Sequence, residues 1–111
     1  MAEINQIQVD GTSYNIEDFG NDAIIVEGAT PTIVAEANRR YVCGTVTALN
    51  FTPSGTGICD VVFSCGSTPA ELTVPNTVMF PDWFDPTDLQ EYTTYELNIL
   101  DGIFGAVGVW V

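Results

Sequence analysis

Short runs of β-branched and aromatic residues, each ended by Gly or Pro, set the strongest limit on what this chain can fold into. Thr, Val, Ile and the aromatic residues fill 46 of the 111 positions, and these residue types suit the pleated, half-buried surface of a sheet. The ten Gly and six Pro residues are scattered along the chain, as expected of turns. Neither a helical period of useful length nor an internal repeat is evident. The sequence therefore predicts an all-β fold.

The spacing of the runs predicts an antiparallel β-sandwich or jelly-roll-like domain of about eight short strands, with a smaller barrel as the alternative. We expect residues 41–49 and 58–65 to pair as a hairpin across the long connection 53–57. Residues 93–100 and 103–111 form a second hairpin, because Asp101-Gly102 suits a tight turn.

The first residues of the chain predict a further β-hairpin. Asp10-Gly11 separates two short apolar-polar runs, and both central residues of a type I′ turn need a positive φ. A lone hairpin is marginally stable in water, so we expect this one to attach to a partner or to the rest of the domain. The sequence divides into an attachment segment (1–19) and a β-sandwich domain (20–111). The predicted interface side chains of the hairpin are Ile4, Ile7, Val9, Tyr14 and Ile16.

Several shorter elements complete the prediction. Strands are expected at 23–26, 31–35, 72–74 and 78–80, of which the last two are followed by Pro and so suit sheet edges. The segment 85–88 combines an N-cap residue, a Pro at the first helical position and an acid at the third. This pattern predicts a single helical turn.

The charge of the chain excludes several classes of protein. There are 15 acidic residues against two basic ones, Arg39 and Arg40, and no His or Lys. A nucleic-acid groove needs clustered cations, and an anionic membrane surface repels such a chain. Without His, neither Ser-His-Asp catalysis nor a His-containing zinc site is available. We therefore expect no nucleic-acid partner, no membrane insertion and no cofactor.

The first residues and the cysteines predict that the protein stays in the compartment where it is made. The opening residues lack the basic start and apolar run of a secretory signal, and no run reaches the roughly 18 apolar residues of a membrane span. We expect Cys43, Cys59 and Cys65 to be reduced and packed as small apolar side chains. Cys59 and Cys65 lie too far apart on one strand to bridge. A pairing of Cys43 with either of them across a sheet remains an alternative.

The acidic residues of the loop 82–88 could hold a metal ion or form a catalytic pair. Asp82, Asp85 and Asp88 give the carboxylate density of a calcium loop, but the D-x-[DN]-x-[DN]-G pattern is absent and Pro86 stiffens the loop. A solvated turn is favoured, and the metal question stays open. Which acids could pair for acid–base work does not follow from the sequence. We expect no catalytic residues and no enzymatic activity.

Aromatic and apolar residues supply the remaining candidates. Trp83 and Phe84 could stack on a sugar ring as a ligand face or plug one end of the sandwich, and the plug is favoured. The last strand, 103–111, has no charged side chain and is apolar on both faces. A strand exposed on one face would alternate apolar and polar residues. We therefore expect this strand to be covered on both faces, either within the domain or by another subunit. Its predicted interface residues are Phe104, Val107, Val109 and Trp110.

Two segments resemble bacteriophage proteins. Residues 4–16 resemble the start of many bacteriophage and prophage virion proteins, notably tail-fibre and related appendage proteins. Residues 78–84, with their Pro-rich approach to a Trp, and the strand 95–102 resemble the carboxyl-terminal β domain of fibre-like proteins in phages of gut bacteria. Together with 41–65 the resemblance covers roughly two thirds of the chain.

The resemblance implies a non-enzymatic structural protein of a virion that is assembled in the cytoplasm of the host bacterium. Fibre proteins have a long shaft between the two segments, and this chain does not, which favours a head decoration, auxiliary capsid or short head-fibre protein. The resemblance further implies a homo-oligomer, most often a trimer, in contact with capsid or tail proteins. A tail-fibre tip, receptor-binding or carbohydrate-binding module that meets a host surface glycan is the alternative, and a small carboxylate-based hydrolase is the third.

Overall fold

The computed structural model of the chain describes residues 6–9, 12–15 and 23–110, of which the first two stretches are described by their backbone. Its regular structure is all β, with no helix in the described residues. Ten strands are present: β1 (Gln6–Val9), β2 (Thr12–Asn15), β3 (Ile24–Val26), β4 (Thr32–Val34), β5 (Arg39–Val46), β6 (Ala48–Thr52), β7 (Ile58–Cys65), β8 (Glu71–Thr73), β9 (Thr94–Leu100) and β10 (Phe104–Trp110).

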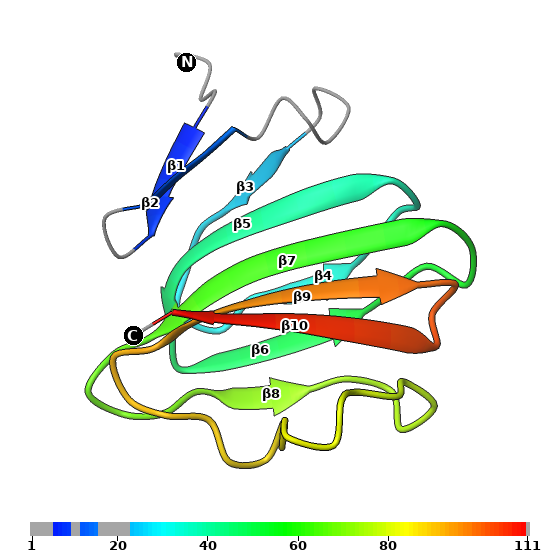
Figure 1. Ribbon diagram of the computed structural model, residues 1–111. Coiled ribbons are helices and arrows are strands. Elements are labelled where there is room, and N and C mark those ends of the chain that lie inside the picture. The colour runs from blue at the N-terminus through cyan, green and yellow to red at the C-terminus, as the bar shows by residue number, and fades with distance from the viewer. Residues whose placement is uncertain (1–5, 10–11, 16–22, 111) are drawn as a thin grey trace.

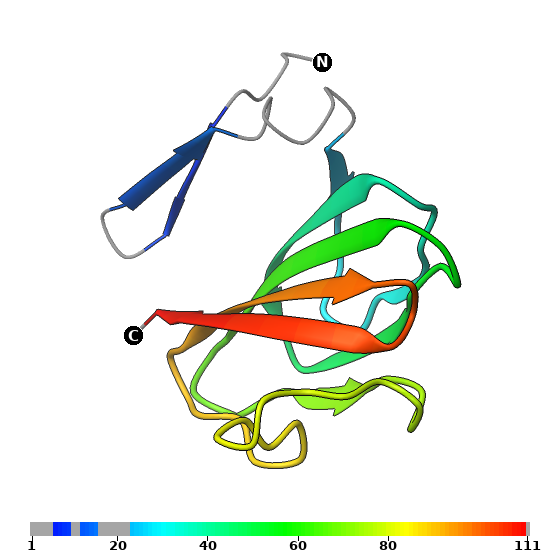
Figure 2. The same ribbon diagram turned by 45° about the vertical axis from the view of Figure 1, so that its right-hand side comes forward.

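The strands from β3 onward form two layers (Figures 1 and 2). One layer is a five-stranded sheet in the order β10-β9-β7-β5-β3, and the other is a three-stranded sheet in the order β4-β6-β8. The first sheet is mixed, because β3, β5 and β7 run parallel whereas β7, β9 and β10 run antiparallel. The second sheet is parallel throughout. The all-β prediction is confirmed, and the prediction of antiparallel pairing throughout is wrong.

The parallel pairing arises because the chain winds through both sheets three times. Each winding, which we call a coil, gives one strand to each sheet: β3 and β4 form the first coil, β5 and β6 the second, and β7 and β8 the third. Each strand pairs with the strand at the same place in the next coil, so Ile24 lies beside Tyr41 and Tyr41 beside Val61. The coils differ in length, so the sequence has no constant spacing by which the repeat could be recognised.

A sharp corner at Thr47 explains why the predicted hairpin is wrong. Thr47 alone separates β5 from β6, and its amide and that of Ala48 both donate to the carbonyl of Ala29 in the first coil (2.7 and 3.2 Å). The predicted strand 41–49 therefore divides between the two sheets. Because β6 intervenes, β7 returns to the first sheet in the same direction as β5.

The core lies between the two sheets. The parallel strands β5 and β7 and the antiparallel strand β9 turn alternate residues toward the smaller sheet. The rings of Phe63 and Tyr95 stack with centroids 5.6 Å apart, and Phe84 meets Tyr95 edge to face at 5.9 Å. The largest fully buried apolar side chains are Phe51, Phe63, Leu49, Leu97, Ile99, Val46 and Val61.

The predicted β9–β10 hairpin is confirmed. Asp101 (φ 54°) and Gly102 (φ 71°) both occupy the left-handed region, as a type I′ turn requires, and the amide of Ile103 donates to the carbonyl of Leu100 (3.0 Å). The β1–β2 hairpin also pairs as predicted, with Val9 opposite Thr12, in a two-stranded sheet of its own. Its predicted domain boundary at residue 19 lies outside the described residues.

The segment between β8 and β9 departs from the sequence prediction. The predicted strand 78–80 is reduced to a single parallel bridge between Met79 and Phe104. The helical turn predicted at 85–88 is wrong, because that segment forms a hydrogen-bonded turn. Asp85, the predicted N-cap residue, accepts bonds at Oδ1 from the amide (2.9 Å) and the hydroxyl (2.6 Å) of Thr87. The cap closes a turn, and no helical residues follow.

We expect Phe63→Ala to lower the free energy of unfolding by about 3–5 kcal/mol, because the ring is fully buried between the sheets and its removal leaves a cavity. Urea titration followed by circular dichroism measures the change. Val34→Ala is the matched control, since Val34 is 76% exposed, and its effect should stay within about 0.5 kcal/mol. Equal losses in the two variants would contradict the described core.

Candidate interaction surface

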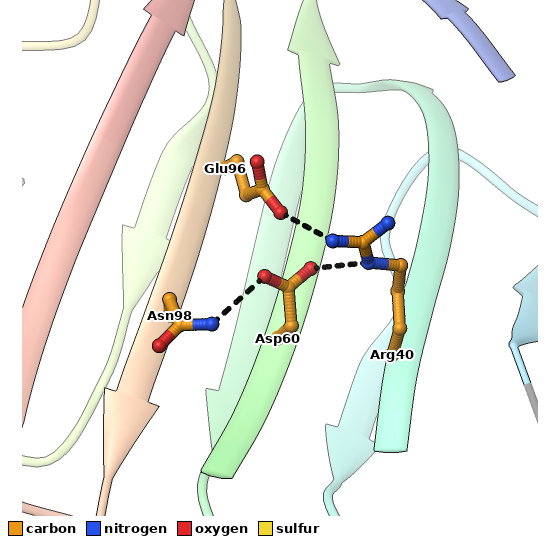
Figure 3. Close-up of polar contacts among 4 residues, drawn as sticks. All are labelled: Arg40, Asp60, Glu96 and Asn98. Carbon is orange, nitrogen blue, oxygen red and sulfur yellow. Dashed lines mark hydrogen bonds and ion pairs between the residues drawn. The ribbon is translucent and has the colours of Figure 1, made fainter. Parts of the chain in front are cut away.

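The outer face of the five-stranded sheet, which points away from the core, carries a polar cluster. Alternation along the strands places Arg40 of β5, Asp60 of β7 and Asn98 of β9 on this face, and the strand register sets Asp60 beside both others. Glu96 lies two residues from Asn98 on the same face of β9. Figure 3 shows the four side chains directed toward one another across three neighbouring strands.

The contacts within this cluster are short. The Nε of Arg40 donates to Oδ1 of Asp60 (3.0 Å), and its Nη2 donates to Oε2 of Glu96 (2.9 Å). The Nδ2 of Asn98 donates to the second oxygen of Asp60 (3.2 Å). The side chain of Asp60 has no exposed surface, and those of Arg40 and Glu96 are 12% and 19% exposed. One guanidinium therefore bridges two carboxyl groups under little solvent.

Burial and the neighbouring acid Glu96 change the pKa of Asp60. Burial, followed by the hydrogen bond and the negative charge of Glu96, raises the pKa of Asp60 from its ordinary 3.8 to about 8. Arg40 and Asn98 oppose this shift, but one positive charge does not offset two negative ones in a desolvated site. The raised pKa favours the protonated form of Asp60 at neutral pH. Asp60 has no exposed surface, and its bonds to Arg40 and Asn98 join β7 to both neighbouring strands.

The second feature of this surface is β10, the last strand of the sheet. Its outer edge is paired at one end by Met79, whose amide donates to the carbonyl of Ile103 (2.6 Å) and whose carbonyl accepts from the amide of Gly105 (2.8 Å). The ring of Phe80 lies against Gly105, where a Cβ would come within 2.8 Å of it. The rest of β10, from Ala106 onward, lies at the edge of the sheet.

The structure distributes the predicted interface residues unevenly. On β10, Phe104 is 56% and Val109 40% exposed, whereas Val107 packs on the core and Trp110 is half-buried. The strand is thus partly covered by its own domain and partly open, a combination that the sequence prediction treated as alternatives. The predicted interface side chains of the first hairpin, namely Ile4, Ile7, Val9, Tyr14 and Ile16, lie outside the described side chains.

The two aromatic residues of the possible ligand face have different environments. Phe84 is buried, with 8% of its surface exposed, and closes one end of the core against Phe80 and Tyr95. Trp83 is 64% exposed, and its ring meets Phe84 edge to face at 6.0 Å. Phe84 therefore plugs one end of the core, and Trp83 is an exposed aromatic side chain.

The remaining candidate groups form no assembled site in the described parts of the chain. No group of three potential metal ligands occurs among these residues, and Asp85, of the three acids 82, 85 and 88, is occupied by Thr87. Cys43, Cys59 and Cys65 are buried and free, as predicted. Burial raises the pKa of Cys43 to about 11 and also raises that of Cys59, so neither thiol is readily ionised.

Sequence reasoning missed the polar cluster and the role of Met79. A signal for the cluster exists: Asp60 is a charged residue inside the apolar run 58–65, and Arg40 is one of only two cations. The bridge of Met79 to β10 had no such signal, because it joins residues from distant parts of the chain by backbone atoms alone.

The sequence matches no protein-family model, and no curated protein and no solved structure is similar enough to count as a match. Within residues 23–110 and the two described strands before them, no helix is long and apolar enough to cross a bilayer.

We expect the stability of the protein to fall as the pH rises from 5 to 8, through the titration of Asp60. The folded state keeps a proton on Asp60 up to a pH of about 8, whereas the unfolded state loses it near pH 4, so folding is favoured on the acidic side of this window. The contribution of one proton is at most a little over 1 kcal/mol per pH unit. The substitution Asp60→Asn should remove this pH dependence, because the amide does not titrate.

Urea titrations at each pH unit from 5 to 8 measure this effect as the difference in slope between wild type and Asp60→Asn. Asp85→Asn is the control, because hydrogen bonds from Thr87 lower the pKa of Asp85 and leave it ionised throughout the window. A slope that Asp60→Asn leaves unchanged would show that Asp60 does not hold the proton.

Proposed function

We propose that this chain is a non-enzymatic structural protein of a bacteriophage particle, a head decoration, auxiliary capsid or short head-fibre protein that assembles with its own copies. The observation that carries the proposal is the edge strand β10: seven residues without a charged side chain, partly open, in a chain of net charge −13. Sheet edges of monomeric proteins are usually guarded by charges, Pro or short length. An unguarded edge on so acidic a chain fits a surface that another subunit covers.

The coiled architecture supports an assembling role. Stacks of coils bury their apolar surface between neighbours, and their end coils need a cap. At one end the β9–β10 hairpin extends the larger sheet in the antiparallel sense. At the other end, β3 and β4 are the edge strands of both sheets. Beyond the third coil, the larger sheet ends at the edge of β10, which is the surface that we assign to assembly.

The resemblance of residues 4–16 to the start of virion proteins suggests how the chain attaches. The β1–β2 hairpin forms a sheet separate from the two sheets of the domain, and an isolated two-stranded sheet is marginal in water. We assign it the attachment to a capsid or tail protein. The net charge keeps free subunits soluble in the host cytoplasm before assembly, where free thiols persist.

Deletion of residues 1–19 should abolish incorporation into particles while residues 20–111 still fold, because the core lies in the two later sheets. Co-sedimentation with phage particles measures incorporation, and circular dichroism measures folding. The full chain is the positive control. A truncated chain that is still incorporated would contradict the attachment role, and a full chain that never enters particles would contradict the proposed function.

Trp83 favours a second candidate, a carbohydrate-binding or receptor-binding module at a tail-fibre tip. Its indole is largely exposed beside the turn that carries Asp82 and Asp85. An exposed ring flanked by hydrogen-bonding side chains suits the apolar face of a sugar and its hydroxyl groups. The two candidate functions are compatible with the same fold. They differ in the partner, which is a host surface glycan here and other virion proteins in the first candidate.

Under the second candidate, Trp83→Ala should lower the affinity for a host surface glycan at least about fivefold, since stacking on an aromatic ring contributes about 1 kcal/mol or more. A glycan array followed by calorimetry measures binding. Tyr92→Asn is the matched control, because Tyr92 is an equally exposed aromatic residue with a positive φ (54°) that Asn tolerates. Absence of any glycan binding by wild type would remove this candidate.

A further inference from the structure

The open part of β10 has a defined pattern of outward-facing backbone groups. The carbonyl of Ile103 and the amide of Gly105 both point away from β9, since both bond to Met79. Backbone groups alternate in direction along a strand, so the amides and carbonyls of Val107 and Val109 also point outward. Neither residue has a further hydrogen-bond partner in the described parts of the chain.

We propose that a second copy of this chain pairs with this edge, β10 against β10 in antiparallel orientation, with Gly108 at the two-fold axis. Val107 then lies opposite Val109 of the partner subunit, and the two pairs exchange four backbone hydrogen bonds. The two five-stranded sheets become one continuous sheet. The proposal rests on the proposed assembly role, because it names the surface through which copies of the chain meet.

Met79 selects this register. A shift that placed Val107 at the axis would set Val109 opposite Gly105 of the partner subunit. That position is taken, because the amide of Gly105 already donates to Met79 (2.8 Å). The register about Gly108 uses both open residues and neither of the paired ones. Among the described residues, it is the arrangement in which the whole open edge complements itself.

The residues around the axis allow a close approach. Residues that face each other without exchanging hydrogen bonds have Cα atoms about 4.5 Å apart, and Gly108 brings no side chain there. The indole of Trp110 lies over Gly108, within 3.1 Å of where a Cβ would be. The two indoles therefore flank the axis on the outer face, while Val107 and Val109 extend the apolar inner face across it.

The local charge favours a second copy over a basic partner strand. In the ladder Gly108 lies opposite Glu96, the acid nearest the proposed axis. Glu96 is neutralised by Nη2 of Arg40 at 2.9 Å, so no unpaired acid of the β9–β10 hairpin faces the incoming strand. Repulsion between two chains of charge −13 then acts over long distances and is screened by salt. Added salt should strengthen pairing of two copies and weaken the binding of a basic strand.

Two substitutions of the full chain test the pairing. Val109→Pro removes an outward amide that β9 does not use, and Pro is tolerated at such edge positions. Val34→Pro is the matched control: Val34 lies on β4, an edge strand of the three-stranded sheet, and the neighbouring Ala35 amide is the one that bonds to β6 (Thr52, 2.8 Å). Analytical ultracentrifugation of each protein, at low and high salt, gives the oligomer mass and the dissociation constant.

We expect wild type and Val34→Pro to form dimers with a dissociation constant on the order of micromolar, typical of a small interface, tightening with salt. Val109→Pro should weaken the dimer at least about a hundredfold. A dimer that survives Val109→Pro, or a trimer, would overturn the β10 pairing and leave the assembly role standing. A wild type that stays monomeric at several hundred micromolar would overturn both.

Amide exchange keeps the test decisive if Val109→Pro fails to fold. In concentrated wild type, the amides of Val107 and Val109 should exchange at least about tenfold more slowly than in a dilute monomer. The amide of Gly105, already bonded to Met79, should show no dependence on concentration. Equal exchange of the Val107 and Val109 amides in dimer and monomer would overturn the pairing.

Discussion

Backbone hydrogen bonding between successive coils holds this protein together. Each strand of the second coil is bonded on both sides, to the first coil and to the third, in both sheets. The apolar side chains between the sheets can pack only because this pairing fixes the strands in register, with Tyr41 beside Val61 and Val61 beside Leu97. The corner at Thr47, the mixed sheet and the open edges all follow from the winding of the chain.

The sequence predicted the local structure and missed the connections. The strands at 24–26, 32–34, 58–65 and 94–100 were anticipated because their residue types and alternation are local properties of a strand. The parallel pairing of the first three with β5 or β6 was not anticipated, because the direction of a strand depends on whether the chain crosses to the other sheet before it. Thr47, an ordinary strand residue by composition, is where that crossing occurs, and its bonds to Ala29 are visible only in three dimensions.

The candidate surface was likewise half predictable. An uncharged last strand is a property of the sequence, whereas its position at a sheet edge is a property of the fold. The cluster of Arg40, Asp60 and Glu96 joins three strands that lie far apart in the chain. No local pattern could bring them together, although an acid inside an apolar strand signals that a partner is needed. The cluster also links β5, β7 and β9 through side chains on the outer face of the sheet.

The order in which the coils pair has a consequence for the speed of folding. Paired residues of successive coils are 17 to 23 positions apart, from Ile24 and Tyr41 to Leu49 and Leu72, so each coil can add to the previous one by closing a modest loop. The step from β7 to β9 is different, because Val61 must find Leu97 across the irregular segment that follows β8. Folding rates fall as contacts become less local. We therefore expect the pairing of β9 with β7 to be the slowest step of folding. Until this step is complete, β7 lacks its second neighbouring strand in the larger sheet.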